Sequence, residues 1–122
     1  MTKEKYYHNG PSLTWQIVHE LENMILRGEL SEGELIYSTK YLMLRFDISD
    51  KTIQRAIGIL HSREMLELVR GKGLRLAEGS LNAVQRYRTK DWRANFKLLL
   101  DDAKLLDISE GDINDIYNEL VS

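Results

Sequence analysis

The segment SDKTIQRA, residues 49–56, carries side chains that could contact the edges of DNA bases. Gln54 has an amide that can pair with both N6 and N7 of adenine, and Lys51 and Arg55 supply positive charge. Ser49 has a hydroxyl that can accept a hydrogen bond from an N–H of the first helical turn. The segment therefore predicts a helix that starts at Ser49 and presents its first residues to a DNA groove.

Asp50 is the exception in this segment, because a surface that binds phosphates would be expected to carry a cation there. An aspartate can accept a hydrogen bond from N4 of cytosine. It can also stabilise a helix start through the helix dipole, or hold Lys51 or Gln54 in one rotamer. We favour the capping or orienting role, since aspartate near a helix N-terminus is common.

Other residues could bind the sugar–phosphate backbone. Tyr37, Ser38 and Thr52 carry hydroxyls that can donate to phosphates, together with N–H groups at two helix starts. Lys40 adds charge beside them. A second basic stretch, RGKG, contributes Arg70, Lys72 and Gly73, and could reach a minor groove or its backbone. Ordinary solvated roles are expected for Arg45, Arg63 and Arg75.

The charges of the chain are unevenly distributed along it. Net charge is −2, but residues 36–76 contain eight Lys or Arg and four Asp or Glu, which gives +4. Residues 1–35 and 77–122 each come to −3. A local field matters more for docking than the total does, so the basic middle block favours nucleic acid as a partner. Random scatter of charge over a solvated surface is the alternative interpretation.

Length and composition exclude several classes of protein. The 122 residues, 43% hydrophobic and 30% charged, indicate one folded domain or one domain with a short appendage. The absence of cysteine excludes disulfides and thiolate metal sites, and favours a cytoplasmic protein. We find no membrane span, signal peptide, paired metal-binding histidines or nucleophile motif. We therefore expect no enzyme, no metal and no cofactor.

The elements that would position these side chains can be read from the apolar spacing. Residues 11–30 predict a helix with Pro11 in its first turn and Gly28 as its stop. Ser38 can cap a short helix, FDIS interrupts it, and Ser49 caps a second short helix. This order is that of a helix-turn-helix. The residues of the second short helix that are expected to face the core of the domain are Ile53, Ala56, Ile57 and Leu60.

A β-hairpin should follow the second short helix. In EMLELVRGKGLRLAE, residues 64–78, leucines alternate with polar residues on both sides of RGKG. Gly71 and Gly73 suit a turn that demands positive φ. The sequence thus predicts a mainly α fold with a small β-hairpin, a winged helix-turn-helix, over residues 1–77.

Residues 78–122 predict a helical tail of two helices. Apolar residues step by three or four from Leu81 to Leu106, interrupted once by Arg88, and Ser109 with Asp112 resembles a capping box. A tail this short cannot cover its own large side chains, and a second chain is the most economical cover. Folding back on the first helix is the alternative. The expected dimer-interface residues are Trp92, Phe96, Leu99, Leu100 and Ala103.

Taken together, these motifs resemble the GntR family of bacterial transcription regulators. The DNA-binding half of that family has the form G-x-L-x-x-G-x-x-L-P-S-x-R-x-L-A, then V-S-R-x-T-V-R-x-A-L-x-x-L, then a G-x-G wing. The matching positions of the first element are Gly28, Leu30, Gly33, Ile36, Ser38, Lys40 and Leu42. Those of the second are Ile48, Ser49, Thr52, Ile53, Ala56, Ile57 and Leu60, and the wing is Gly71 and Gly73.

The tail is similar to that of the short YtrA-type members, which implies a role in dimerisation and no large effector domain. Four positions depart from the family pattern. Tyr37 replaces a proline, and Lys40 replaces an arginine, keeping charge but losing the planar fork. Asp50 and Gln54 replace two arginines that typically contact bases or phosphates. The family's base preference therefore does not carry over.

The sequence accordingly predicts a DNA-binding transcriptional regulator, a homodimeric repressor that binds a palindromic operator through the helix at Ser49 and a basic wing. A small-molecule effector could bind near Trp15, Tyr87 or Trp92, although core packing is the simpler role for these rings. No membrane partner is expected. The alternatives are a winged-helix protein-interaction module, or a plasmid or phage accessory protein with weak or altered DNA binding.

Overall fold

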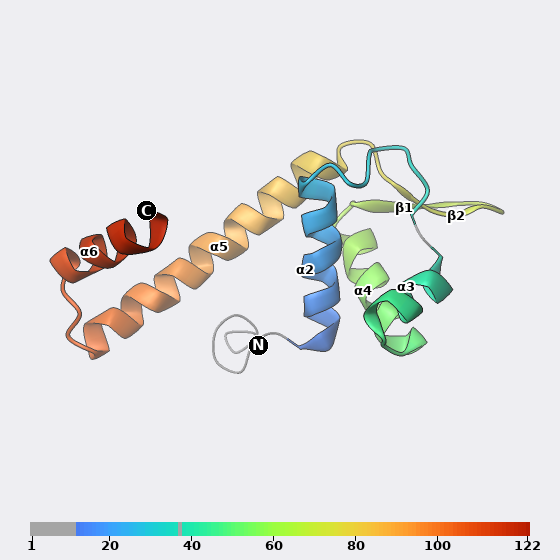
Figure 1. Ribbon diagram of the computed structural model, residues 1–122. Coiled ribbons are helices and arrows are strands. Elements are labelled where there is room, and N and C mark those ends of the chain that lie inside the picture. The colour runs from blue at the N-terminus through green and yellow to red at the C-terminus, as the bar shows by residue number, and fades with distance from the viewer. Residues whose placement is uncertain (1–11, 37) are drawn as a thin grey trace. The chain divides into compact units, whose positions relative to one another are not determined.

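The computed structural model describes residues 12–36 and 38–122 (Figure 1). Two positions of the sequence analysis, Pro11 and Tyr37, lie outside these ranges. The described elements are α2 (Leu13–Leu26), α3 (Thr39–Phe46), α4 (Asp50–Ser62), β1 (Leu66–Val69), β2 (Gly73–Leu76), α5 (Ser80–Leu105) and α6 (Glu110–Val121). The chain forms two compact units, Met1–Thr89 and Lys90–Ser122. Among the described residues, no helix combines the length and the hydropathy of a membrane span.

Helix α2 supplies one wall of the core of the first unit. Ser12 caps it, because the Ser12 hydroxyl accepts a hydrogen bond from the Trp15 N–H at 3.4 Å. Of the stripe predicted from three- and four-residue spacing, Ile17, Leu21, Met24 and Ile25 are confirmed as buried, whereas Leu13, in the first turn, is 48% exposed. Gly28, with a φ of +77°, follows the helix as a left-handed stop.

Helices α3 and α4 form the predicted helix-turn-helix. Ser38 caps α3 by accepting from the Tyr41 N–H at 3.1 Å, and Ser49 caps α4 by accepting from the Thr52 N–H at 3.3 Å. Asp47 turns the chain between them with a left-handed backbone, φ 53° and ψ 53°. Residues 47–49 form the turn, and the second helix starts after Ser49 as the sequence predicted.

The core lies where α4 packs against α2 and β1. The four residues predicted to face inward from α4 are confirmed as buried: Ile53, Ala56, Ile57 and Leu60. Figure 1 shows α2, α3 and α4 gathered beside the hairpin. Burial of this stripe fixes the rotation of α4 about its axis, and therefore which side chains of α4 face outward.

The predicted wing is an antiparallel hairpin of β1 and β2. Leu66 pairs with Leu76, and Val69 pairs with Gly73. The Lys72 N–H donates to the Val69 carbonyl at 2.9 Å, which closes the turn. Gly71 and Gly73 adopt φ values of +76° and +110°, as the turn chemistry requires. The mainly α fold with a winged helix-turn-helix is thus confirmed.

A third extended segment, which the sequence analysis treated only as a turn around Gly33, pairs with β2. The Gly33 N–H donates to the Leu76 carbonyl, and the Ile36 N–H donates to the Leu74 carbonyl, each at 2.9 Å. Leu35 and Arg75 form an isolated bridge between them. This pairing covers one edge of β2, which anchors the wing to the loop between α2 and α3.

The second unit consists of the later part of α5 and of α6. Asp107, with a φ of 56°, ends the first of these helices. The predicted capping box is confirmed: the Asp112 N–H donates to the Ser109 hydroxyl at 3.1 Å, and the Ser109 N–H donates to the Asp112 carboxylate at 3.0 Å. The hydrogen bond from the Ser109 N–H, and after it that of the Ser109 side chain, lower the pKa of the Asp112 carboxyl from its ordinary value.

Candidate nucleic-acid interface

The first two turns of α4 divide their side chains between the core and the outer surface. Asp50, Lys51, Gln54 and Arg55 are exposed, whereas Ile53 is completely buried. This is the division a helix needs when one face holds it to its own domain and the other contacts a partner. The polar side chains predicted to contact bases therefore share the exposed face.

Asp50 lies beside Gln54, in keeping with the orienting role favoured from the sequence. Gln54 Nε2 donates to Asp50 Oδ1 at 3.5 Å, and to the Thr39 hydroxyl of α3 at 3.4 Å. The cap itself is Ser49, so Asp50 is the first-turn acid that follows the cap. A bidentate contact with adenine requires Nε2 to donate to N7, so it would replace these two long hydrogen bonds.

Thr39 is a member of this cluster that the sequence analysis missed. Its hydroxyl lies at the first helical position of α3, and it meets a residue 15 positions later in the chain. The local signal was a second hydroxyl directly after the cap at Ser38. Only the crossing of α3 and α4 brings it to Gln54, and sequence spacing does not give that crossing.

The starts of α3 and α4 supply hydroxyls and backbone N–H groups in two places. Ser38, Lys40 and Ser49 are exposed, and Thr52 is half-buried with its hydroxyl 3.1 Å from that of Ser49. A helix N-terminus with unsatisfied N–H groups and a nearby cation is a favourable environment for a phosphate oxygen. The arrangement can bind an anion at each helix start.

The tip of the wing is basic and exposed. Arg70 and Lys72 lie on either side of Gly71 in the turn, and both are exposed. Arg75, farther along β2, donates from Nε to the Glu67 carboxylate of β1 at 2.6 Å. Since that pair neutralises Arg75, the positive charge of the wing that is available to a partner is concentrated at its tip, on Arg70 and Lys72.

The expectation that Arg63 is an ordinary solvated residue is wrong. Its side chain is only 15% exposed, and Nη1 lies 3.3 Å from the buried carboxylate of Glu22. Its guanidinium lies over the rings of Trp15 and Tyr87, at 4.9 and 4.7 Å from their centroids. Two of the three rings considered for an effector, those of Trp15 and Tyr87, therefore contact an arginine of the same chain.

The residues predicted for a dimer interface differ in exposure. Trp92 is 64% exposed, Phe96 43% and Leu99 50%, while Leu100 is half-buried and Ala103 is buried. The rings of Trp92 and Phe96 stack with their centroids 5.4 Å apart. Large apolar side chains thus lie on the surface of the second unit.

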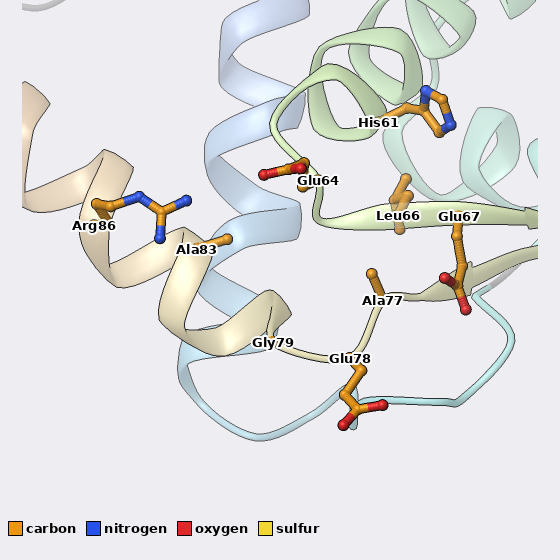
Figure 2. Close-up of a pocket in the computed structure, with 9 residues that line it drawn as sticks. All are labelled: His61, Glu64, Leu66, Glu67, Ala77, Glu78, Gly79, Ala83 and Arg86. Atoms are coloured by element: carbon orange, nitrogen blue, oxygen red, sulfur yellow. The ribbon is translucent and has the colours of Figure 1, made fainter.

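An open concavity of about 490 Å³ lies at the opposite end of α4 from Ser49 (Figure 2). Its lining is mostly charged or small, and comprises His61, Glu64, Leu66, Glu67, Ala77, Glu78, Gly79, Ala83 and Arg86. Figure 2 shows the Arg86 side chain extending from α5 toward Glu64. Within the described part of the chain, no group of three His, Asp or Glu side chains could hold a metal ion.

Comparison with protein families identifies the chain. Residues 13–76 match the model of the bacterial regulatory proteins of the gntR family, which is more than half of the sequence. The chain therefore belongs to the GntR family and is a DNA-binding transcriptional regulator. Among curated proteins, none matches it significantly.

Solved structures share its fold. A GntR family transcriptional regulator from Listeria monocytogenes is 24% identical with a TM-score of 0.73, and the match covers 93% of this chain and 98% of that one. A transcriptional regulator from Oenococcus oeni is 18% identical with a TM-score of 0.71, over 90% and 91%. The DNA-binding domain of AraR, in complex with operator ORR3, is 33% identical with a TM-score of 0.50, over 52% and 77%.

Proposed function

We propose that the protein is a homodimeric transcriptional repressor that binds an inverted-repeat operator through the start of α4 and the tip of the wing. The observation that carries this proposal is the division of α4: a buried inner stripe fixes the helix, and Lys51, Gln54 and Arg55 stand on its exposed face. The basic wing tip adds a second contact from the same unit. The structure of the related AraR domain with its operator supports DNA as the partner.

Each proposed contact follows from side-chain chemistry. Lys40, Lys51 and Arg55 supply charge to phosphates, and Ser38, Ser49 and Thr52 add hydroxyl donors at the two helix starts. Gln54, oriented by Asp50, reads adenine. Arg70, Lys72 and Gly73 place the wing against the minor groove or its backbone, and Tyr37 joins the phosphate contacts as the sequence analysis expected.

The second unit supports the homodimer. Within residues 90–122, all of which the structure describes, Ala103 is the only buried hydrophobic side chain. A helix pair without a core of its own must bury its apolar face elsewhere, and a second copy offers a self-complementary surface. The exposed apolar residues available to it include Trp92, Phe96, Leu99, Ile116, Tyr117 and Leu120. This two-helix tail is the reason to place the protein among the short YtrA-type members.

A dimer with two such helices calls for an operator with two half-sites about one helical turn apart, roughly 10 bp between centres. Affinity should fall steeply with salt, because binding of phosphates by lysine and arginine releases counterions.

Selection of binding sequences from random duplex DNA, followed by gel shift at two salt concentrations, tests the proposal. We expect an inverted repeat to be enriched, and Lys51→Ala to weaken its binding by about tenfold. Lys90→Ala removes an exposed lysine outside the proposed interface and is the matched control. Failure to select any specific sequence at low salt would contradict the proposal.

Asp50 motivates one other candidate, a winged helix that binds a protein instead of an operator, since it places a carboxylate on the exposed face of α4. A Lys40→Glu/Lys51→Glu double variant separates the two. Loss of DNA affinity supports the regulator, whereas unchanged DNA affinity with loss of a protein complex supports the interaction module.

A further inference from the structure

The first three turns of α5 are attached to the winged helix-turn-helix at several points. Glu32, in the loop after α2, accepts hydrogen bonds from the N–H groups of Gly79 at 2.8 Å and Leu81 at 3.3 Å. It therefore caps α5 from 47 residues away. Ala83 and Val84 are buried in the core of the first unit. The start of α5 thus belongs to the DNA-binding unit.

A buried carboxylate lies at the centre of this attachment. The Glu22 side chain is 2% exposed, and two arginines from different elements face it. Arg63 Nη1 lies 3.3 Å from Glu22 Oε2, and Arg88 Nη1 lies 3.6 Å from Oε1. A buried charge is strongly unfavourable without a partner, so Glu22 requires at least one of these arginines beside it.

Arg88 extends the same network along α2. Its Nη1 donates to Asn23 Oδ1 at 2.8 Å, and its Nη2 lies 3.2 Å from His19 Nε2. One side chain of α5 therefore contacts three residues of α2, spread over one helical turn. Contacts at several points on one helix restrict rotation of the other far more than a single ion pair would.

Arg63 connects this network to α4, the helix proposed to contact the operator. It is the C-cap residue of α4, and its guanidinium lies between Trp15 of α2 and Tyr87 of α5. Cation–π contacts strengthen when the cation is shielded from water, as this one is. The end of α4 opposite to Ser49 is thus tied to α5 by Arg63, and α5 is tied to α2 by Arg88.

We propose that Arg88 is a positioning residue that fixes the direction in which α5 leaves the DNA-binding unit. A fixed start of α5 would restrict the separations that the two copies of α4 in the proposed dimer can adopt. The protein would then discriminate between operators by the spacing of their half-sites. This inference rests on the proposed function, and it concerns a residue that does not itself face DNA.

A purely structural ion pair would behave differently from a positioning residue. Loss of a structural pair would lower thermal stability and leave the direction of α5 and the spacing preference unchanged. The variant Arg88→Gln distinguishes the two, because Glu22 keeps Arg63 as its partner. Arg93→Gln, an exposed position on the same helix with the same change in net charge, is the matched control.

The direction of α5 can be measured without DNA. The chain contains no cysteine, so nitroxides can be attached at Gly58→Cys on α4 and Lys90→Cys on α5 alone. A Cβ at Gly58 meets no atom within 4 Å, and Lys90 is exposed. Labelled full-length protein is diluted with unlabelled protein, and the distance distribution is recorded by pulsed electron paramagnetic resonance.

We expect the distribution to be narrow in the labelled parent and about twofold wider with Arg88→Gln, whereas Arg93→Gln leaves it unchanged. An unchanged width with Arg88→Gln would overturn the inference. If that variant does not fold, Arg88→Lys takes its place under the same criterion. It keeps the charge for Glu22 but loses the planar fork that reaches Asn23 and His19.

Binding to DNA gives the second measurement. With Arg88→Gln, affinity for a single half-site should stay within about twofold, while the preference for the natural spacing over a spacing two base pairs longer should fall by about fivefold or more. A preserved preference would also overturn the inference. If the parent protein binds no DNA, the proposed function fails, while the distance distribution still decides whether Arg88 fixes α5.

Discussion

At the start of α4, capping the helix and orienting a neighbouring side chain are the roles of two different residues, Ser49 and Asp50. Ser49 provides the cap, with its hydroxyl 3.3 Å from the Thr52 nitrogen, so Asp50 is not needed to close the first turn. Its carboxylate instead lies 3.5 Å from Gln54 Nε2. A negative charge on this face repels phosphates, so it should lower affinity for all DNA while restricting the conformations of Gln54.

Replacement of Asp50 by arginine should therefore leave the domain folded and change how it binds DNA. With Asp50→Arg we expect affinity for unrelated duplex DNA to rise by about tenfold at low salt, because a repulsive charge becomes attractive. The ratio of specific to non-specific affinity should fall, since Gln54 loses a partner. Fluorescence anisotropy with the selected operator and a scrambled duplex measures both.

Glu110 offers a matched control for this change. It is the first residue of α6 and follows the cap at Ser109, as Asp50 follows Ser49 in α4. Glu110→Arg alters the net charge equally, away from the proposed interface, and should leave the specificity ratio unchanged. Unfolding of the Asp50→Arg protein would show instead that Asp50 is required for the fold.

At the scale of elements, the sequence predicted most of the features whose causes lie within a few residues. Hydroxyl caps at Ser38 and Ser49, apolar spacing in α2 and α4, and glycines in the wing placed each element, because their causes lie within a few residues. Pairing of residues 33–36 with β2 could not be predicted in this way. Its hydrogen bonds join segments about 40 residues apart and depend on the packed core.

The contacts that attach α5 to α2 could likewise not be predicted from the sequence. From the sequence alone, Arg88 was interpreted only as an interruption in the apolar spacing, and Arg63 was interpreted as a solvated surface residue. The signal available was Glu22, a carboxylate within the apolar stripe of α2, next to Leu21. A buried acid predicts a cationic partner, but only the three-dimensional arrangement shows that two arginines supply it.

The contact between α2 and α5 should make stability depend on pH through His19. Partial burial, then the positive charge of Arg88, lowers the pKa of His19, while Glu20 opposes this shift. Arginine donates only, so His19 Nε2 must accept from Arg88 in its neutral form. Below about pH 6.5 the unfolded chain binds a proton that the folded chain resists, so stability should fall as pH falls.

Thermal melts at pH 7.5 and 5.5 measure this dependence. Because His19 is only partly buried and is screened by solvent, we expect it to account for about 1 to 3 °C of the loss in Tm, which His19→Gln should remove. His61→Gln, a histidine on α4 away from Arg88, is the control and should keep the parent's dependence. Equal slopes for the parent and His19→Gln would contradict the prediction.

At the scale of the whole molecule, the second unit has large apolar residues on its surface, which the proposed second copy would cover. Phe96→Asp should convert the dimer into a monomer, since a carboxylate would have to enter an apolar interface, at a cost of about 3 kcal/mol or more. Affinity for the paired operator should fall by about 100-fold, while affinity for one half-site stays near that of the parent. Analytical ultracentrifugation and gel shift measure the two effects.

Leu13→Asp tests whether any charged substitution at an exposed apolar residue has this effect. Leu13 is 48% exposed and lies at the start of α2 in the first unit, so this variant should remain dimeric. A Phe96→Asp protein that still sediments as a dimer would show that the interface lies elsewhere.

The cap that Glu32 provides to α5 also bears on how such regulators can be recombined. The family match ends at Leu76, yet the N–H groups that Glu32 binds belong to Gly79 and Leu81, and the second arginine facing Glu22 comes from residue 88. A chimaera joined at Leu76 would leave Glu32 without its helix and Glu22 with one cation. The portable module therefore ends near Thr89, and a new tail grafted there leaves both Glu32 and Glu22 with all the partners they have in the parent.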